Sequence, residues 1–262
     1  MERAQKKRIA LVTAASRGIG YACAEALAQQ GNVIEICSRD RDRIEGAAKR
    51  LRETTGAQVC GHVCDIRDPE QNEQLIEAVL KRHGRIDIFV FNSGSPPSGR
   101  FENATEEDWK EGRRLCMQPT IQFLNLLLPS MEAQEWGRIV FINSIFGKEP
   151  DPGYAVSSAE RAAQLALVKC TARTSAPKGV TINAILPGYV DTPLVREYAA
   201  KEAVTRNTKT DSILAEWADM IPRKRLAIPD EIGSLVAMLA SDAGGNISGA
   251  AIQSDGAMLR GY

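Results

Sequence analysis

Short apolar segments alternate with longer segments of helical periodicity along almost the whole chain. The apolar segments predict strands near residues 8–13, 33–38, 58–64, 86–91, 137–143, 180–186 and 250–254. Apolar positions three or four residues apart predict helices near 18–30, 41–54, 69–83, 105–132, 154–175 and 229–240. Strands this apolar are typically covered on both faces, which favours a parallel sheet between helices. The pattern therefore predicts an α/β fold with a doubly wound parallel sheet in three α/β/α layers.

A single domain over residues 1–262 is expected, because no long linker, internal repeat or low-complexity tract interrupts this alternation. Right-handed crossovers bring the carboxyl ends of parallel strands to one edge of the sheet, where ligands bind. We therefore expect the ligand-binding and catalytic residues to lie just after the predicted strand ends, at Thr13, Cys37, Cys64, Phe91, Asn143 and Leu186. Residues 193–228 are patterned less regularly, and we interpret them as a helical flap near that edge.

The first predicted strand and helix are joined by a turn of small residues, and residues 9–20 read IALVTAASRGIG. Glycines in such a turn let backbone N–H groups approach a pyrophosphate, and the helix N-terminus adds partial positive charge. The alternative is a tight turn without a ligand. We interpret the turn as the dinucleotide cradle of a Rossmann-type fold. Its candidate cofactor-binding residues are Thr13, Ser16, Arg17, Gly18, Ile19 and Gly20.

Charge and cysteine content exclude several classes of partner. Lys plus Arg and Asp plus Glu both total 33, so no net charge attracts the chain to nucleic acid or to an acidic membrane. No apolar run approaches the roughly 20 residues that span a bilayer. The six cysteines lie in apolar segments without CxxC pairs, as free thiols do in a reducing compartment. These features predict a soluble, cytoplasmic protein.

Cys60, His62 and Cys64 alternate along the third predicted strand and suggest a metal site. A strand would point all three side chains to one face. The sequence shows no fourth ligand, however, and a packed strand explains the same alternation. We therefore expect no bound metal.

Motifs at the predicted strand ends resemble those of the short-chain dehydrogenases/reductases, particularly the β-ketoacyl carrier-protein reductase-like branch. They follow the family's order: TAASRGIG at 13–20, CD at 64–65, NSG at 92–94, GRIVFINS at 137–144, LPGYVDTP at 186–193 and ISGAAIQSDGA at 247–257. The resemblance covers nearly the whole chain. It implies a dinucleotide-dependent oxidoreductase on a Rossmann-type sheet.

The resemblance also implies roles for residues after the later strands. Asp65 corresponds to the carboxylate that holds the adenine amino group, and Asn92 and Gly94 to the loop beside the adenine ribose. The turn that holds the nicotinamide and its carboxamide corresponds to Pro187, Gly188 and Thr192. Helix caps and turns are the alternative, because Asp, Asn and Gly favour such places.

Charge at the end of the second predicted strand favours NADP(H) over NAD(H). An NAD site of this kind places an acidic side chain there for the ribose 2′-hydroxyl, whereas a 2′-phosphate calls for arginine. The strand ends in Cys37-Ser38-Arg39, and Arg17 lies in the first turn. Two guanidinium groups there can hold a phosphate through charge-assisted hydrogen bonds. Asp40 is the candidate that would serve NAD instead.

Three of the four positions that carry catalysis in this family hold different residues here. The resemblance places the family's serine at Ser144 and its tyrosine thirteen positions later, at Ser157. The family's lysine falls on Arg161 and its helix asparagine, in the register of EEDW at 106–109, on Cys116. Serine is a far weaker acid than tyrosine, whose unperturbed pKa is about 10. Arginine keeps the positive charge of lysine but stays protonated.

Tyr154 is a candidate replacement for the missing acid. It stands three residues before Ser157, so on a helix the two side chains project from nearly the same face. In this hypothesis Tyr154 reaches toward Ser144 and supplies the proton that a forming alkoxide needs. The alternative is that Tyr154 only packs the start of its helix.

Three functions are consistent with these residues. The first is an NADP(H)-dependent oxidoreductase of a carbonyl or alcohol substrate, for example an acyl thioester, with an unorthodox acid. The second is a nucleotide-binding subunit or sensor without turnover, and the third is a cyclase or isomerase. An open cavity beside the nicotinamide would favour an enzyme.

Two explanations are open for four arginines of the chain. They bind an acidic substrate, or, more simply, they lie on a solvated surface. The four are Arg113, Arg114, Arg223 and Arg225.

The helices predicted at 105–132 and 154–175 carry more apolar residues than one face of a sheet covers. These residues include Leu124, Leu127, Leu128, Leu165 and Leu167. Members of the resembled family use these helices to form dimers and tetramers around two-fold axes. We therefore expect a homotetramer.

Overall fold

The computed structural model describes residues 7–261 and contains one parallel sheet of seven strands in that range. The strand order is β3-β2-β1-β4-β5-β6-β7, so the chain winds outward in both directions from β1. The strands are β1 (Ile9–Val12), β2 (Val33–Ser38), β3 (Val59–Val63), β4 (Ile88–Phe91), β5 (Gly137–Ile142), β6 (Val180–Pro187) and β7 (Ala251–Ser254). The predicted doubly wound α/β fold is confirmed.

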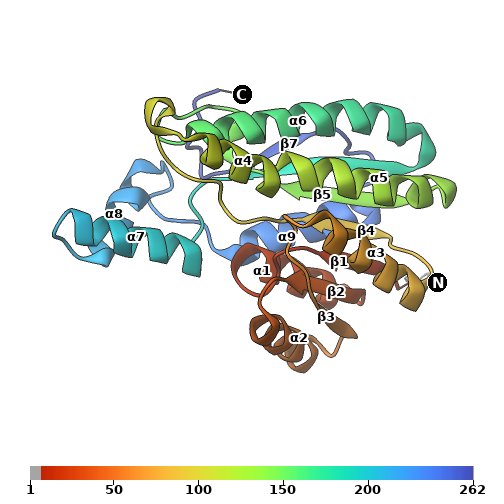
Figure 1. Ribbon diagram of the computed structural model, residues 1–262. Helices are drawn as coiled ribbons and strands as arrows, with labels where there is room; N and C mark the ends of the chain where they lie inside the picture. The colour runs from red at the N-terminus through yellow and green to blue at the C-terminus, as the bar shows by residue number, and fades with distance from the viewer. Residues whose placement is uncertain (1–6, 262) are drawn as a thin grey trace.

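Helices cover both faces of the sheet (Figure 1). One face carries α3 (Pro69–His83), α4 (Glu106–Leu115), α5 (Met117–Ala133) and α6 (Ala155–Ser175). The other face carries α1 (Gly18–Gln29), α2 (Arg41–Thr55) and α9 (Pro229–Ala240). Alternate strand residues point into an apolar cluster on each face. Phe89, Phe91, Phe123 and Phe141 pack together in the cluster beneath α5.

The prediction of one helix over 105–132 is wrong, because the structure has two helices that meet at Cys116. The backbone of Cys116 has φ −117° and ψ −79°, which no regular helix adopts. In the sequence, Pro119 explains why the helix breaks at Cys116. Proline has no N–H to donate to the carbonyl of Leu115, and its ring clashes with that carbonyl in a continuous helix.

Residues 193–228 form α7 (Pro193–Thr205) and α8 (Thr210–Met220), which stand to one side of the sheet (Figure 1). These two helices have a small core of their own, made by Ala199, Ala203 and Ile213. Trp217 of α8 stacks on Tyr189, which follows β6, with ring centroids 5.4 Å apart. The two helices are therefore anchored beside the carboxyl end of β6.

All six cysteines are free thiols, and Cys23, Cys37, Cys64 and Cys116 are buried. Within residues 7–261, no helix combines the length and the apolar character needed to cross a membrane.

Candidate functional site

The turn between β1 and α1 is shaped by close backbone contacts. Gly18 adopts φ +60°, and a Cβ on Gly20 would lie 2.6 Å from the Ala14 carbonyl oxygen. The buried Thr13 hydroxyl donates to the Asn92 carbonyl at 2.7 Å and accepts from the Asn92 N–H at 2.9 Å. Thr13 and Gly20 thus fix the path of the turn against the end of β4, behind the surface that a ligand would touch.

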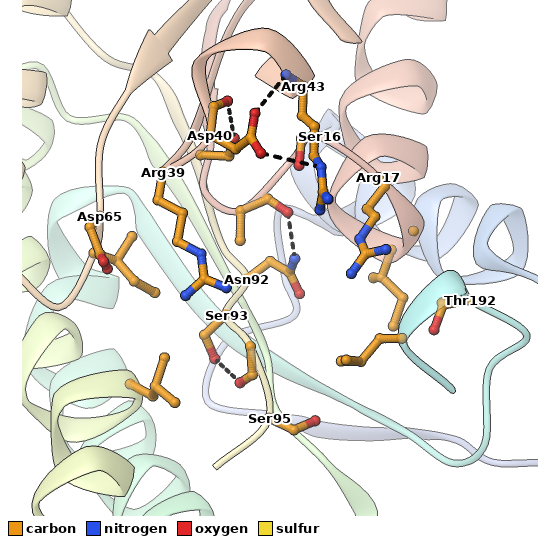
Figure 2. Close-up of a pocket in the computed structure, with 18 of the residues that line it drawn as sticks. Ser16, Arg17, Arg39, Asp40, Arg43, Asp65, Asn92, Ser93, Ser95 and Thr192 are labelled. Atoms are coloured by element: carbon orange, nitrogen blue, oxygen red, sulfur yellow. Dashed lines mark hydrogen bonds and ion pairs between the residues drawn. The ribbon is translucent and has the colours of Figure 1, made fainter. Parts of the chain in front are cut away.

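A cavity of about 420 Å³ opens in front of this turn (Figure 2). It contains ten of the fourteen predicted cofactor residues: Ser16, Arg17, Gly18, Ile19, Ser38, Arg39, Asp65, Asn92, Gly94 and Thr192. In the described chain, no side chain caps the N-terminus of α1. Its first backbone N–H groups are therefore available to an anion. We call this space the first cavity.

Two predicted phosphate ligands, Arg17 and Arg39, point into the first cavity from opposite sides, with Asn92 between them (Figure 2). Arg17 is also paired with Glu197 of α7 at 2.6 Å. The alternative ligand Asp40 is engaged as the cap of α2, where it accepts from the Arg43 N–H at 3.0 Å. The charge in this part of the cavity thus favours a phosphate over a hydroxyl group.

Asp65 lies at the carboxyl end of β3 and is held by a residue that the sequence did not single out. The Arg67 guanidinium donates to both Asp65 carboxylate oxygens, with Nη2 2.5 Å from Oδ2, and pairs with Glu111 of α4 at 2.9 Å. Hydrogen bonds from Arg67 hold the pKa of Asp65 below its usual value, against the opposing effect of burial. Asp65 is therefore an ionised acceptor, already oriented by Arg67.

A second cavity of about 350 Å³ adjoins the first across the sheet edge. The two share wall residues Ile19, Asn92, Ser93, Ser95, Leu194 and Tyr198. The second cavity also brings together Ser144, Tyr154, Ser157, Arg161, Pro187 and Gly188. The four predicted catalytic residues thus lie on the walls of one space, next to two predicted nicotinamide-binding residues.

Ser144 and Tyr154 each interact with Phe146, which lies between them in the chain. The Ser144 hydroxyl accepts from the Phe146 N–H at 3.2 Å. The Tyr154 ring stacks on the Phe146 ring, with centroids 4.4 Å apart and an interplanar angle of 17°. Burial raises the pKa of Tyr154, and a hydrogen bond with Tyr189 offsets part of that rise. Tyr154 is therefore a protonated phenol at neutral pH.

Arg161 is buried and fixed between the ends of two strands. Its Nη1 donates to the Ile142 carbonyl at 2.8 Å, and its Nη2 to the Ser93 hydroxyl at 3.1 Å. Its buried Nε has no hydrogen-bond partner among the described residues. Because Ser93 lies on the walls of both cavities, the Arg161 charge lies at their junction.

Cys116 is fully buried at the break between α4 and α5 and lines neither cavity. Burial raises the pKa of its thiol, and the charge of Arg161 opposes that rise. The carbonyl of Cys116 accepts from the Thr120 hydroxyl at 2.7 Å, and that hydroxyl accepts from Gln164 at 2.7 Å. Gln164 accepts from Asn143 at 2.7 Å, whose Oδ1 accepts from the Ser144 N–H at 2.8 Å. A buried hydrogen-bond chain thus links the helix break to Ser144.

Aromatic side chains form much of the second cavity wall, and the sequence motifs did not indicate most of them. Phe146, Tyr154 and Tyr189 lie near the sheet, while Tyr198 and Trp217 come from α7 and α8. These residues are far apart in sequence, so only the tertiary fold brings them together. The wall suits an apolar or planar ligand.

Four arginines considered for an acidic substrate are not brought together. Arg113 lies 3.8 Å from Glu160, and Arg114 lies 3.3 Å from Glu107, both on the α4 side. Arg225 pairs with Glu231 at 2.6 Å in a separate cavity that Arg223 also lines. Three of the four are therefore matched with carboxylates.

A doubly wound sheet, an uncapped helix after a glycine turn and a two-part cavity at the carboxyl edge define a dinucleotide-binding α/β protein. The family described as enoyl-(acyl carrier protein) reductase matches residues 13–258. The chain belongs to the short-chain dehydrogenase/reductase family of oxidoreductases, in its ketoreductase-like branch. The predicted resemblance is thereby confirmed.

Two relatives and one solved structure illustrate this membership. The acetoacetyl-CoA reductase of Shinella zoogloeoides is 34% identical over 249 residues, which are 95% of this chain and 97% of the relative. The human dehydrogenase/reductase SDR family member 4 is 29% identical over 243 residues, or 92% and 84%. The crystal structure of L-sorbose reductase from Gluconobacter frateurii, complexed with NADPH and L-sorbose, is 28% identical. Its TM-score is 0.94, with 98% of each chain covered.

Proposed function

We propose that the protein is an NADP(H)-dependent oxidoreductase that interconverts a carbonyl and an alcohol on a 3-oxoacyl-like substrate. The observation that carries this proposal is that the two cavities adjoin and share wall residues, with the second one open beside Ser144. A site retained only for binding would have no reason to keep that space free of side chains. The acetoacetyl-CoA reductase relative supports the substrate class.

The residues of the first cavity fit the adenosine half of the cofactor. The uncapped α1 N-terminus would hold the pyrophosphate, and Gly18 would allow its close approach. Arg39, assisted by Arg17, would bind the 2′-phosphate, since both line the first cavity. Asp65, Asn92 and Gly94 contact the adenosine. The NADPH bound in the L-sorbose reductase structure supports this choice of cofactor.

The nicotinamide half would lie at the junction with the second cavity, held by Pro187, Gly188 and Thr192, which line the two cavities. When bound, the nicotinamide supplies or accepts the hydride. Ser144 holds the substrate oxygen, and Tyr154 donates the proton to it. Arg161 stabilises negative charge on that oxygen from its fixed place, and Ser157 contacts the ligand from the same wall. The aromatic wall holds the rest of the substrate.

A nucleotide-binding protein with little or no turnover is the second candidate, and two observations favour it. Arg161 is held by Ile142 and Ser93, and Cys116 is fully buried and lines neither cavity. Neither side chain is placed to relay a proton to the substrate. Loss of a positioned acid costs roughly 10²- to 10⁴-fold in rate. In this second candidate, turnover is therefore slow or absent.

The assembly and location belong to the same proposal. We propose a homotetramer in the cytoplasm, formed through α5 and α6. Leu124 and Leu127 are buried against the sheet within one chain, so they are unavailable to a partner. Ile121 of α5 is 47% exposed and is the large apolar side chain that we assign to the interface.

Nucleotide titration combined with turnover tests the proposal. NADPH should bind more tightly than NADH, and the absorbance of reduced nicotinamide should fall with β-ketoacyl thioesters, ketones or quinones as substrates. Ser144→Ala should abolish that turnover and leave NADPH binding intact. Binding without any turnover would favour the second candidate. Absence of binding by either nucleotide would refute both.

A further inference from the structure

A second cluster of reactive side chains lies on the α3 face of the sheet, on β2 and β3. Glu35 of β2 is paired in register with Cys60 of β3, and His62 is the next residue of β3 on the same face. The Glu35 carboxylate, the Cys60 thiol and a His62 ring nitrogen lie within 4.8 Å of one another. The sequence pattern of β3 alone could not reveal the carboxylate, because it comes from the neighbouring strand.

Glu35 is the buried centre of this cluster, at 1% exposure. Both histidines of the chain contact it: His62 meets Oε2, and His83 at the end of α3 lies 2.7 Å from Oε1. Burial alone would raise the pKa of Glu35, but the hydrogen bonds from both histidines and the charge of Arg82 hold it below its usual value. The cluster therefore presents a buried carboxylate beside a thiol and an imidazole.

We propose that Glu35, Cys60 and His62 form a binding site for a zinc-like divalent cation. One oxygen, one sulfur and one nitrogen ligand is a donor set that Zn²⁺ accepts, with water in the fourth position. Cys60 and His62 are half-buried, so an ion can enter from solvent. His83 holds the other oxygen of Glu35 and orients the carboxylate, as second ligand shells do in metal sites.

Arg82 is the competing cation at this site. Its guanidinium lies 3.3 Å from the Glu35 carboxylate, and its side chain is 45% exposed. An incoming cation would displace it toward solvent, where an arginine is well hydrated.

The position of the cluster indicates a structural role for the metal. Glu35 and Cys60 lie within their strands, away from the carboxyl edge that forms the two cavities. Strand β3 is the edge of the sheet, and a metal shared by Glu35 and His62 would tie it to β2. Metal binding should therefore raise the melting temperature without being needed for nucleotide binding.

Cobalt and zinc titrations of the purified full-length protein test this proposal. Co²⁺ should produce a thiolate-to-cobalt absorption band in the native protein. Cys60→Ser should lose the band and bind Zn²⁺ at least about tenfold more weakly, and His83→Gln should weaken Zn²⁺ binding about tenfold. The matched control is Cys170→Ser, which removes an exposed thiol on α6 and should behave like the native protein.

The outcomes separate a metal site from a plain ion-pair cluster. A zinc-dependent rise in melting temperature in the native protein and in Cys170→Ser, but not in Cys60→Ser, would support the proposal. Circular dichroism of Cys60→Ser without metal would show that the variant is folded. Cobalt bound without a thiolate band, or zinc affinity equal in Cys60→Ser and the native protein, would overturn it.

Discussion

Arg39 shows how one side chain can determine the choice of coenzyme. Among residues 7–261 it makes no ion pair, and it points into the first cavity from the end of β2. We predict that Arg39→Ala weakens NADPH binding about tenfold or more, because a hydrogen bond to a charged group is worth about 1.5–3 kcal/mol. NADH binding should not change. Isothermal titration calorimetry with both nucleotides measures this difference.

Arg173→Ala is the control for this prediction, since it removes an exposed arginine of α6. It should leave the affinities for both nucleotides at the native values. Equal losses of NADPH and NADH affinity in Arg39→Ala would show that Arg39 acts on the whole cofactor and not on its 2′-phosphate.

Tyr154 is the residue on which the proposed proton transfer depends. Tyr154→Phe keeps a ring to stack on Phe146 but removes the hydroxyl. We predict a fall in kcat of about 100-fold with little change in KM. Because burial raises the pKa of Tyr154, reduction by the native protein should persist above neutral pH and decline only above about pH 10. A pH profile of kcat measures both effects, and an unchanged kcat in the variant would exclude Tyr154 as the acid.

Ionisation of the buried Glu160 side chain should lower the stability of the folded protein, so its effect should depend on pH. It is buried on α6, its Oε2 has no partner among the described residues, and burial raises its pKa despite the opposing charge of Arg113. A raised folded-state pKa means that the unfolded chain loses this proton first, so stability falls as pH rises through the glutamate range. Thermal melts of Glu160→Gln should show a gain near pH 7 that shrinks below about pH 4, the ordinary range of glutamate.

The exposed Glu77 of α3 provides the control for Glu160. Glu77→Gln should leave the melting temperature almost unchanged at either pH, because solvent screens that side chain. A lower melting temperature of Glu160→Gln at neutral pH would show that the carboxylate contributes a favourable interaction instead.

At the scale of elements, α4 and α6 approach each other at a position that only glycine can fill. A Cβ on Gly112 would lie 2.3 Å from Val156 Cγ1. A glycine inside an open helix costs about 1 kcal/mol relative to alanine, but a forced contact in a packed interface costs about 1–3 kcal/mol. We therefore predict that Gly112→Ala lowers the free energy of unfolding, as measured by urea denaturation.

Gly46 of α2 is the matched glycine, because the nearest atom to its Cβ would be an arginine nitrogen 3.5 Å away. Gly46→Ala should raise the free energy of unfolding by roughly 0.5–1 kcal/mol. If both variants were stabilised, the α4–α6 contact would have room that the structure does not show.

The break between α4 and α5 shows what a pattern of apolar residues can and cannot predict. The spacing of apolar residues continues across Cys116, so periodicity alone predicts one helix. Pro119 was the available signal, since its missing N–H removes one bond of the ladder. The buried hydrogen-bond chain from Cys116 through Thr120 and Gln164 to Asn143 could not be predicted from the sequence, because its residues come from three different elements.

At the scale of the whole molecule, the proposed tetramer depends on apolar surface that one chain leaves exposed. Ile121→Glu places a charge on that surface of α5, and burying it between subunits would be costly. We predict that sedimentation of Ile121→Glu at micromolar concentration shows smaller species than the native protein. Val204→Glu, at an 83% exposed position of α7, should not change the assembly. A native monomer at that concentration would contradict the proposal.

The sequence by itself determined the doubly wound sheet, the glycine turn and the family, because these depend on local periodicity and on motifs read in order. The tertiary structure decided which side chains meet. Arg67 on Asp65, Arg161 on Ser93 and the aromatic wall of the second cavity involve packing geometry that spacing does not encode. The same holds for Glu35 beside Cys60, since strand pairing, not sequence proximity, sets their distance.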